Sequence, residues 1–298
     1  MFRLVLFAVT FITSFATTGA IAGLLPTSES PAALCHIKYK TSNNKTINCS
    51  GVLVSDRIVA TAAHCITDDI DRRIGGISVT CGTGTTSFQE SFWAFGYSVN
   101  PSWYSFWYHH DTGSDFAFLS LDKRATTIEP MMVANSSSSM WSSFLYPSPT
   151  SAGSYELRPD IECRFSRHGY DEKNDVLTLR TSDRSPKTTG IKGFVSSNLY
   201  QLSALVINQW LDTPDVVRTN ESGGAFYCRR GPGSPWILFG LLCGKWLVPN
   251  SYEDTGVRVM SLAISDQFLQ QLRSFQKTLE HHESRKSLSL ETSKQLAP

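Results

Sequence analysis

The chain has 298 residues, of which 41% are hydrophobic and 11% aromatic, so it can bury a substantial core. Its 27 basic and 26 acidic residues give a net charge of +1. This composition excludes a disordered chain. The near-balance of charge gives no electrostatic basis for binding nucleic acid or an anionic membrane surface.

The first 22 residues have the layout of a secretory signal peptide. Arg3 precedes an apolar run from Leu4 to Phe15, and small residues follow as far as Ala22. This pattern predicts cleavage before Gly23 and export, either outside the cell or to a periplasm. The alternative is a membrane anchor, but the residues at 17–19 end the apolar run before the roughly 20 residues that a spanning helix needs. We therefore expect no membrane contact after the signal is removed.

The body of the chain is predicted to be all-β. Its apolar stretches are short, rich in Val, Ile, Phe and Trp, and separated by Gly, Ser, Asn and Pro, which favours strands over helices. In a secreted protein, the seven cysteines are expected to form disulfides. The clearest strand candidates are residues 51–60, 114–121, 176–179, 191–196 and 236–242.

Two segments in the first half carry residues typical of catalysis. His64 lies in Thr61-Ala62-Ala63-His64-Cys65, and Asp115 begins the apolar run 115–121. Asp111 is the main alternative carboxylate. The intervening segment 97–111 is unusually aromatic, and it fits either a packed surface loop or a wall of a substrate cleft.

The second half contains a linker, a candidate nucleophile and a helix. Residues 136–154 are crowded with Ser, Pro and Thr and read as an interdomain linker. Ser222 lies in Asn220-Glu221-Ser222-Gly223-Gly224-Ala225. Apolar residues at three- and four-residue steps predict a helix over 263–280, with Ser265 as its cap, and the polar segment 281–298 is predicted to be a mobile tail.

A histidine, an aspartate and a serine together form a known catalytic device. Neutral serine is a poor nucleophile, so it needs an imidazole to take its proton and a carboxylate to fix the imidazole's tautomer. The chain carries these residues in the order His64, Asp115, Ser222.

These segments and their cysteines resemble the trypsin and chymotrypsin family of serine endopeptidases. Cys49 and Cys65 lie 65 − 49 = 16 positions apart, with the histidine directly before the second cysteine. Cys228 follows Ser222 by 228 − 222 = 6, and Cys163 precedes it by 222 − 163 = 59. The resemblance runs from about residue 31 to about residue 275.

The resemblance implies a fold of two six-stranded antiparallel β-barrels with a C-terminal helix. Residues 23–135 would form the first barrel, with the histidine and the aspartate, and residues 155–262 the second, with the serine. Asp115 is preferred to Asp111 because the apolar strand that follows it is the one the family places after its aspartate.

The resemblance also implies the disulfides Cys49–Cys65 and Cys163–Cys228. We further expect Cys35 to pair with Cys81, because the corresponding strands of the family are neighbours. Cys243 would then be a free thiol, buried as a small apolar side chain.

By family analogy, the backbone N–H groups of Asn220 and Ser222 would form the oxyanion hole. Asn220 stands where the family has glycine, and asparagine is one of the few other residues that readily adopt the backbone conformation needed there.

Glu221 stands where the family's aspartate pairs with a new N-terminus and orders the substrate pocket. The predicted mature end, Gly23, precedes His64 by 64 − 23 = 41 positions, as the family's activated terminus does. We therefore expect signal cleavage to expose an amine that Glu221 binds. The alternative is that no N-terminal pairing occurs.

Substrate specificity is only weakly indicated. Val216 falls where trypsins carry the aspartate that selects Arg or Lys, although a gap of one residue would put Asp215 there. Cys243, Gly244 and Lys245 resemble the strand segment that pairs with the substrate backbone.

The leading prediction is a secreted, monomeric serine endopeptidase that acts on polypeptides and needs neither metal nor cofactor. The alternative is a catalytically inactive homologue that serves as a binding or adhesion module. An α/β-hydrolase esterase is excluded because its serine comes first in the chain. A cysteine protease that uses the free Cys243 is excluded because no histidine has a matching context near it.

Overall fold

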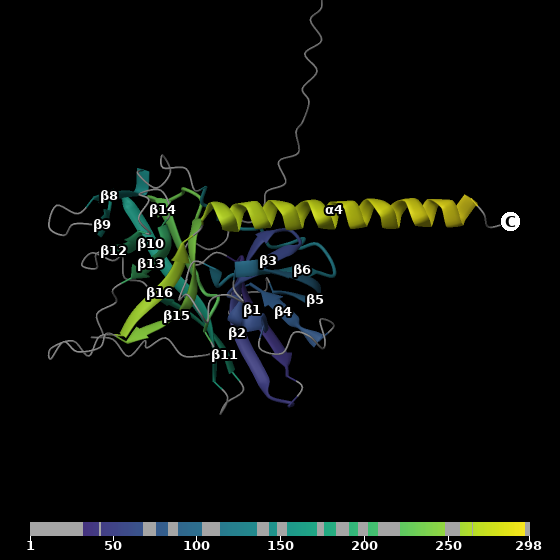
Figure 1. The fold of residues 1–298 in the computed structure, drawn as a ribbon, viewed down its shortest axis with the longest axis horizontal. Coiled ribbons are helices and arrows are strands. Elements are labelled where there is room, and N and C mark those ends of the chain that lie inside the picture. The colour runs from purple at the N-terminus through teal and green to yellow at the C-terminus, as the bar shows by residue number, and fades with distance from the viewer. Residues whose placement is uncertain are drawn as a thin grey trace, which may run out of the picture.

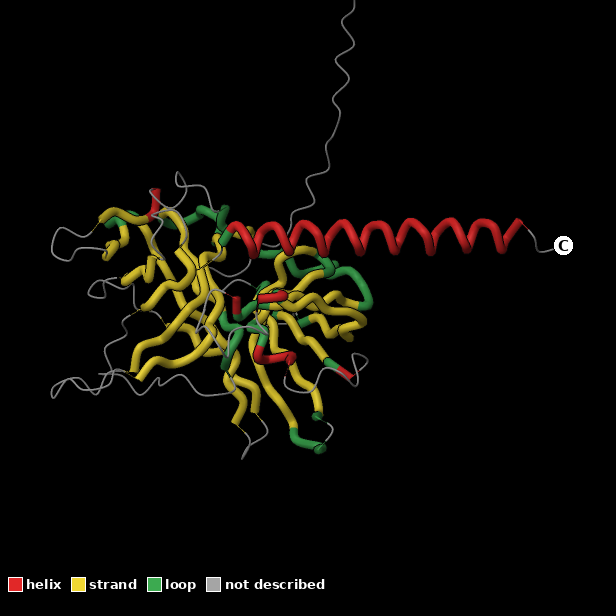
Figure 2. Tube along the Cα trace, viewed as in Figure 1, coloured by secondary structure: helices red, strands yellow, loops and turns green. Residues whose placement is uncertain are grey.

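The computed structural model describes mostly strands, with one long helix near the C-terminus (Figure 2). No helix within the described ranges is both long and apolar enough to cross a membrane. The predicted signal peptide, Asp111 and the aromatic residues 103–108 lie outside these ranges. The structure describes residues 32–41, 43–67, 76–82, 89–102, 114–135, 143–147, 154–171, 176–182, 191–195, 202–207, 221–247, 257–263 and 265–295.

Six antiparallel strands of the first half close into a barrel, in the order β1-β2-β3-β6-β5-β4. Buried aliphatic and aromatic side chains such as Ile37, Val52 and Phe118 fill the core. The short helix α1 (His64–Thr67) directly follows the third strand. The strands are β1 (Leu34–Lys40), β2 (Thr46–Ser55), β3 (Ile58–Thr61), β4 (Ser78–Cys81), β5 (Glu90–Val99) and β6 (Ala117–Leu121).

The second half forms a ten-stranded sheet in the order β11-β10-β14-β15-β16-β13-β12-β9-β8, with β7 paired to β15 (Figure 1). Its strands are β7 (Met132–Val133), β8 (Leu145–Pro147), β9 (Ser154–Leu157), β10 (Ile161–Asp171), β11 (Val176–Ser182), β12 (Ile191–Val195), β13 (Leu202–Ile207), β14 (Ala225–Arg230), β15 (Ile237–Leu247) and β16 (Val257–Ala263).

The all-β, chymotrypsin-like fold is confirmed, but the second sheet differs from the six-stranded barrel that the resemblance implies. Strand β12 pairs with β13 along one edge and with β9 along the other, through Ile191 and Lys192. Among the described strands, β11 is therefore not a neighbour of β12. The extra strand β8 lies within residues 136–154 and β9 begins at Ser154, so this segment contributes to a hairpin of the sheet as well as linking the two halves.

The two halves are joined where the chain passes from one to the other. The Met131 N–H donates to the Leu53 carbonyl in the barrel, at 2.9 Å, and the Ala134 N–H donates to the Leu238 carbonyl in the sheet, at 2.8 Å. Between these bonds, β7 pairs in parallel with β15. A segment of four residues therefore carries backbone hydrogen bonds to both halves.

Three disulfides are present among the described residues, and all three were predicted. Cys35–Cys81 joins β1 to β4, and Cys163–Cys228 joins β10 to β14, in each case between residues that face each other in the strand register. Cys49–Cys65 joins β2 to α1. Cys243 lies in β15 at an irregularity of the register, and its side chain is outside the described set.

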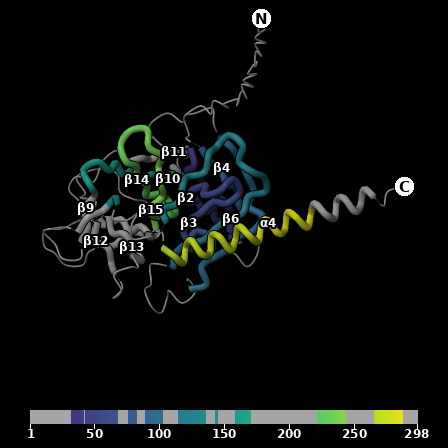
Figure 3. The backbone as a smooth tube through the Cα atoms, turned by 90° about the horizontal axis from the view of Figure 1, so that it is seen from above, coloured from purple at the N-terminus to yellow at the C-terminus, as the bar shows by residue number. Residues whose placement is uncertain are grey.

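The C-terminal helix α4 (Asp266–Gln295) begins where the sequence predicts and packs on the first barrel. Ser265 caps it, since the Phe268 N–H donates to Ser265 Oγ at 3.2 Å. The fully buried Phe268 ring lies 5.0 Å from the ring of Phe116 and 4.9 Å from that of Phe118. Seen from above, the helix crosses the barrel beside β3 and β6 (Figure 3).

The helix is longer than predicted. Residues 281–295, which we expected to lie in a mobile tail, continue the helix to Gln295. Glu283 provides a physical reason, because it forms ion pairs with Arg57 and with Arg124, the latter at 2.9 Å. These contacts hold the helix against the barrel at residue 283, three residues beyond its predicted end, and its last turns extend beyond the barrel (Figure 1).

Candidate active site

His64 and Asp115 form a hydrogen-bonded pair. His64 Nδ1 lies 2.8 Å from Asp115 Oδ2, and the His64 backbone N–H donates to Asp115 Oδ1 at 3.0 Å. Since a carboxylate can only accept, Nδ1 carries the proton and donates it in the bond. This tautomer leaves Nε2 unprotonated, so Nε2 can accept a proton from a nucleophile.

Each partner of this pair is held by its local structure. Asp115 comes just before β6, and its residue is only 4% exposed, whereas the His64 side chain is 31% exposed. Two fully buried alanines, Ala62 and Ala63, lead from β3 into α1, and Cys65 is fixed by its disulfide. The imidazole is therefore accessible to a substrate while its carboxylate is shielded from water.

Ser222 lies in a tight turn between the two halves of the molecule. The Ser50 N–H in β2 donates to the Ser222 carbonyl at 2.7 Å. On the other side of the turn, the Gly223 N–H donates to the Leu242 carbonyl, and the Leu242 N–H donates to the Gly224 carbonyl, both at 2.7 Å. The backbone around Ser222 is therefore bound both to the barrel and to β15.

Gly223 is the position where only glycine fits. Its φ is +83°, a conformation that other residues adopt at a cost. An added Cβ would lie 2.0 Å from the Ser50 carbonyl oxygen and 2.5 Å from Thr61 Oγ1. Thr61 Oγ1 itself donates to that carbonyl at 2.7 Å, so neither atom can easily move away.

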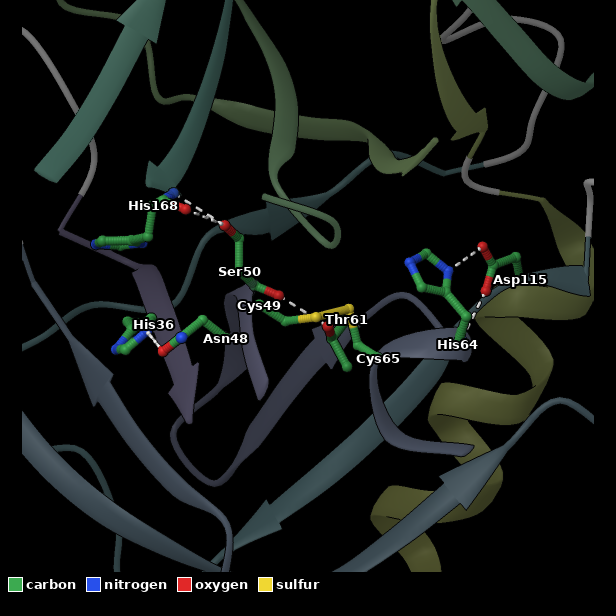
Figure 4. The surroundings of a disulfide bond; sticks show 9 residues. All are labelled: His36, Asn48, Cys49, Ser50, Thr61, His64, Cys65, Asp115 and His168. Carbon is green, nitrogen blue, oxygen red and sulfur yellow. Dashed lines mark hydrogen bonds and ion pairs between the residues drawn. A yellow bond between two sulfur atoms is a disulfide. The ribbon is translucent and has the colours of Figure 1, made fainter. Parts of the chain in front are cut away.

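A short covalent path connects the support of the serine turn to the histidine (Figure 4). Ser50 follows Cys49, which is bonded to Cys65, and Cys65 follows His64. The disulfide therefore restrains the distance between the residue that holds Ser222 and the residue that would activate it.

Glu221, beside the serine, is buried in an ion pair that the sequence analysis missed. Arg167 Nε donates to Glu221 Oε2 at 2.8 Å, and both side chains are 0% exposed. Nothing marks Arg167 in the sequence, but an acidic residue next to a buried serine is itself a sign that a cation lies near. The partner we expected, the Gly23 amine, lies outside the described residues, so that pairing stays a prediction.

Two buried histidines lie behind the serine turn. His36 Nε2 is 3.0 Å from Asn48 Oδ1, and the rings of His36 and His168 are 6.1 Å apart. Burial lowers the pKa of His36 to about 4, with a smaller effect from Lys38. Burial, and then the charge that His36 would carry, lower the pKa of His168 to about 4. Both rings are therefore neutral at pH 7.

The His168 backbone connects this pair to the serine turn. The His168 N–H donates to Ser50 Oγ at 2.9 Å, and Ser50 Oγ in turn lies 3.4 Å from the His168 carbonyl oxygen. Ser50 thus binds β10 through its side chain and Ser222 through its backbone.

The remaining predicted site residues are only partly described. Asn220, of the predicted oxyanion hole, and Val216, of the predicted pocket, lie outside the described residues. Gly244 and Lys245 belong to β15 and pair in register with Met260 and Val259 of β16. The roles of all these residues stay predictions.

The family model for trypsin matches residues 28–149 of the chain. Residues 28–149 therefore resemble the trypsin family. This finding confirms the resemblance to the trypsin-like serine proteases, a family in which disulfides and extracellular location are typical. The match covers His64 and Asp115 and ends before Ser222. No curated protein matches the chain.

Proposed function

We propose that the trypsin-family chain is a secreted serine endopeptidase that uses Ser222, His64 and Asp115. The observation that carries the proposal is the two-point contact between His64 and Asp115, at 2.8 and 3.0 Å. It fixes both the ring orientation and the tautomer that a general base requires. A histidine with a purely structural role would not need a shielded carboxylate on Nδ1 and an accessible ring.

In the first half of the reaction, His64 Nε2 takes the proton of Ser222 Oγ as this oxygen attacks a peptide carbonyl carbon. The C–N bond then breaks, and the imidazolium gives its proton to the leaving amine. The product is an acyl-enzyme on Ser222. Water then attacks the ester with His64 again as base, which releases the acid and restores the serine.

Negative charge develops on the carbonyl oxygen during both attacks. The N–H groups of Asn220 and Ser222 would stabilise this charge, and loss of one such donor typically lowers turnover by about 10²- to 10³-fold. The hydrogen bonds of Gly223 and Gly224 to Leu242 support the proposal, because they restrain the turn that carries these donors.

The expected substrate is a polypeptide, and the expected state is a monomer in an oxidising compartment. Three disulfides support the compartment, since such bonds form and persist in secreted proteins. Val216, Cys243, Gly244 and Lys245 are proposed to line the substrate-binding groove. The mechanism needs neither metal nor cofactor.

The proposal is tested by incubating the oxidised protein, processed at Gly23, with an unfolded protein substrate and identifying new peptide termini by mass spectrometry. We expect the wild type to cleave internal peptide bonds and the Ser222→Ala variant, of equal thermal stability, to cleave none. If the folded wild type cleaves no bond, the inactive binding module becomes the better reading of this fold.

A further inference from the structure

The ion pair between Arg167 and Glu221 is the most deeply buried one in the described part of the chain, and it lies next to the nucleophile. Both side chains are 0% exposed, and their atoms are 2.8 Å apart. The other ion pairs among the described residues are partly exposed to solvent. Two charges are stable in such a position only when they are paired with good geometry.

Arg167 also belongs to the part of β10 on which the serine turn rests. A Cβ added to Gly224 would lie 2.9 Å from Arg167 Cβ and 2.9 Å from the Ser166 carbonyl oxygen. On the other side of Arg167, the His168 N–H donates to Ser50 Oγ. Three consecutive residues of β10 therefore contact the turn or the residue that supports it.

On the basis of the proposed function, we propose that Arg167 is a positioning residue that orders the oxyanion-forming turn from within the chain. Its guanidinium holds Glu221, and Glu221 is bonded to Ser222, whose N–H is a predicted oxyanion donor. Arg167 thereby does what a freed N-terminal amine was expected to do. Hydrolysis should then not require a free amine at Gly23.

Charge balance supports this assignment. The Arg167 guanidinium and the Glu221 carboxylate form a neutral pair, so the charge of Glu221 is balanced from within the chain. Arginine also suits the role better than a terminal amine would, because its planar guanidinium donates in fixed directions. The nearby Phe165 ring, with its centroid 5.5 Å from the guanidinium carbon, restrains the same group further.

The first test removes the charges together. In the double variant Arg167→Met/Glu221→Leu, apolar side chains of similar size fill the space without leaving an unpaired charge. We expect thermal stability near that of the wild type, kcat lower by roughly 10²-fold and KM changed little. If the double variant has the kcat of the wild type as well as its stability, the pair has only a structural role and the proposal is wrong.

Two single variants show whether the effect on kcat is specific to Arg167. Arg167→Lys keeps the charge without the planar guanidinium and should have a kcat between those of the double variant and the wild type. Arg164→Met removes a partly exposed arginine of the same strand, paired with Glu162 at 2.9 Å, and should leave kcat unchanged. Equal losses from Arg164→Met and Arg167→Lys would contradict a specific role for Arg167.

A second test concerns the amine. A chain that begins at Gly23 and a chain with two extra residues before Gly23 should have kcat/KM values within about threefold, because the cation is internal. If the extension abolishes hydrolysis while the chain that begins at Gly23 is active, the amine is the partner of Glu221 and the proposal fails.

Hydrogen exchange separates this proposal from the proposed function. The Gly223 N–H, bonded to Leu242, should be protected in the wild type and exchange faster in the double variant at equal thermal stability. This result would support the ordering role even if no hydrolysis were found, and in that case only the proposed function would fail. Unchanged protection in the double variant would overturn the ordering role.

Discussion

The Ser50 N–H donates to the carbonyl of Ser222 at 2.7 Å, so the first barrel holds the backbone of a residue that the second half supplies. Ser50 is also next to Cys49, whose disulfide reaches Cys65 beside the histidine. The candidate nucleophile and its candidate base are therefore supported by the same short stretch of β2. Any change that shifts this stretch should reduce activity before it unfolds the protein.

Gly223→Ala should abolish hydrolysis. The added methyl would lie 2.0 Å from the Ser50 carbonyl oxygen, so the turn must move away from the barrel. Turnover of a peptide substrate and thermal unfolding measure the two consequences, and we expect a loss of more than about 2 kcal/mol in stability.

Gly233→Ala is the matched control for this prediction. Gly233 has a φ of +85°, close to that of Gly223, but an added Cβ would meet no atom within 4 Å. Its variant should lose only about 1 kcal/mol from backbone strain and keep full activity. If the two variants behave alike, the contact with Ser50 is not what requires glycine at position 223.

Asp115→Asn should lower kcat by about 10⁴-fold with little change in stability. The amide can still accept from the His64 N–H, but it can donate to Nδ1 and so favour the wrong tautomer. Asp122→Asn is the control. Asp122 is exposed and accepts a hydrogen bond from the Trp93 N–H rather than from the histidine. A kcat loss below tenfold in Asp115→Asn would show that this carboxylate does not orient the base.

The two buried histidines predict a loss of stability in acid. Both have a folded-state pKa of about 4 against an ordinary value of 6.5, so between these values the unfolded chain binds more protons than the folded one. Above pH 6.5 both histidines are neutral in the folded and in the unfolded chain, so they do not reduce the stability there. Stability should fall by about 1.4 kcal/mol per pH unit for each histidine as pH drops toward 4.

Urea unfolding at a series of pH values between 7 and 4 measures this slope. His168→Phe keeps an aromatic ring but binds no proton, so it should remove about half of the slope over this range. A variant with the wild-type slope would mean that His168 is already protonated, or is exposed, in the folded protein.

The packing of α4 on the barrel predicts a large loss of stability from a substitution near the start of the helix and a small loss from a substitution at residue 283. Phe268→Ala removes a fully buried ring that contacts Phe116 and Phe118, which should cost about 3–5 kcal/mol. Glu283→Gln breaks partly exposed ion pairs with Arg57 and Arg124, which should cost less than about 1 kcal/mol. Chemical denaturation measures both, and equal losses would contradict the packing described here.

Much of the first barrel and its site could be predicted from the sequence. His64 and Cys65 are adjacent in the chain, and Cys49 is only a short distance before them. The local sequence pattern was therefore enough to predict the histidine and its neighbouring disulfide. The helix start was also predictable, because Ser265 and Asp266 are local signals of a helix N-terminus.

Other features depend on contacts between distant residues. The pairing of Arg167 with Glu221 joins positions 54 residues apart and leaves no pattern around either one. The length of α4 depends on Glu283 reaching two arginines of the barrel, while the local composition is merely polar. The pairing of β9 with β12 depends on which sheet edge is left open, and this follows only from the assembled sheet.

Whether Ser222 is an activated nucleophile is tested by reaction of the oxidised protein with a serine-directed fluorophosphonate, followed by mass spectrometry of the labelled peptide. An activated serine should carry one phosphonyl adduct, on Ser222, and labelling should be lost in His64→Ala and strongly slowed in Asp115→Asn. Absence of labelling in folded wild-type protein, or an adduct on any other residue, would show that Ser222 is not the activated nucleophile.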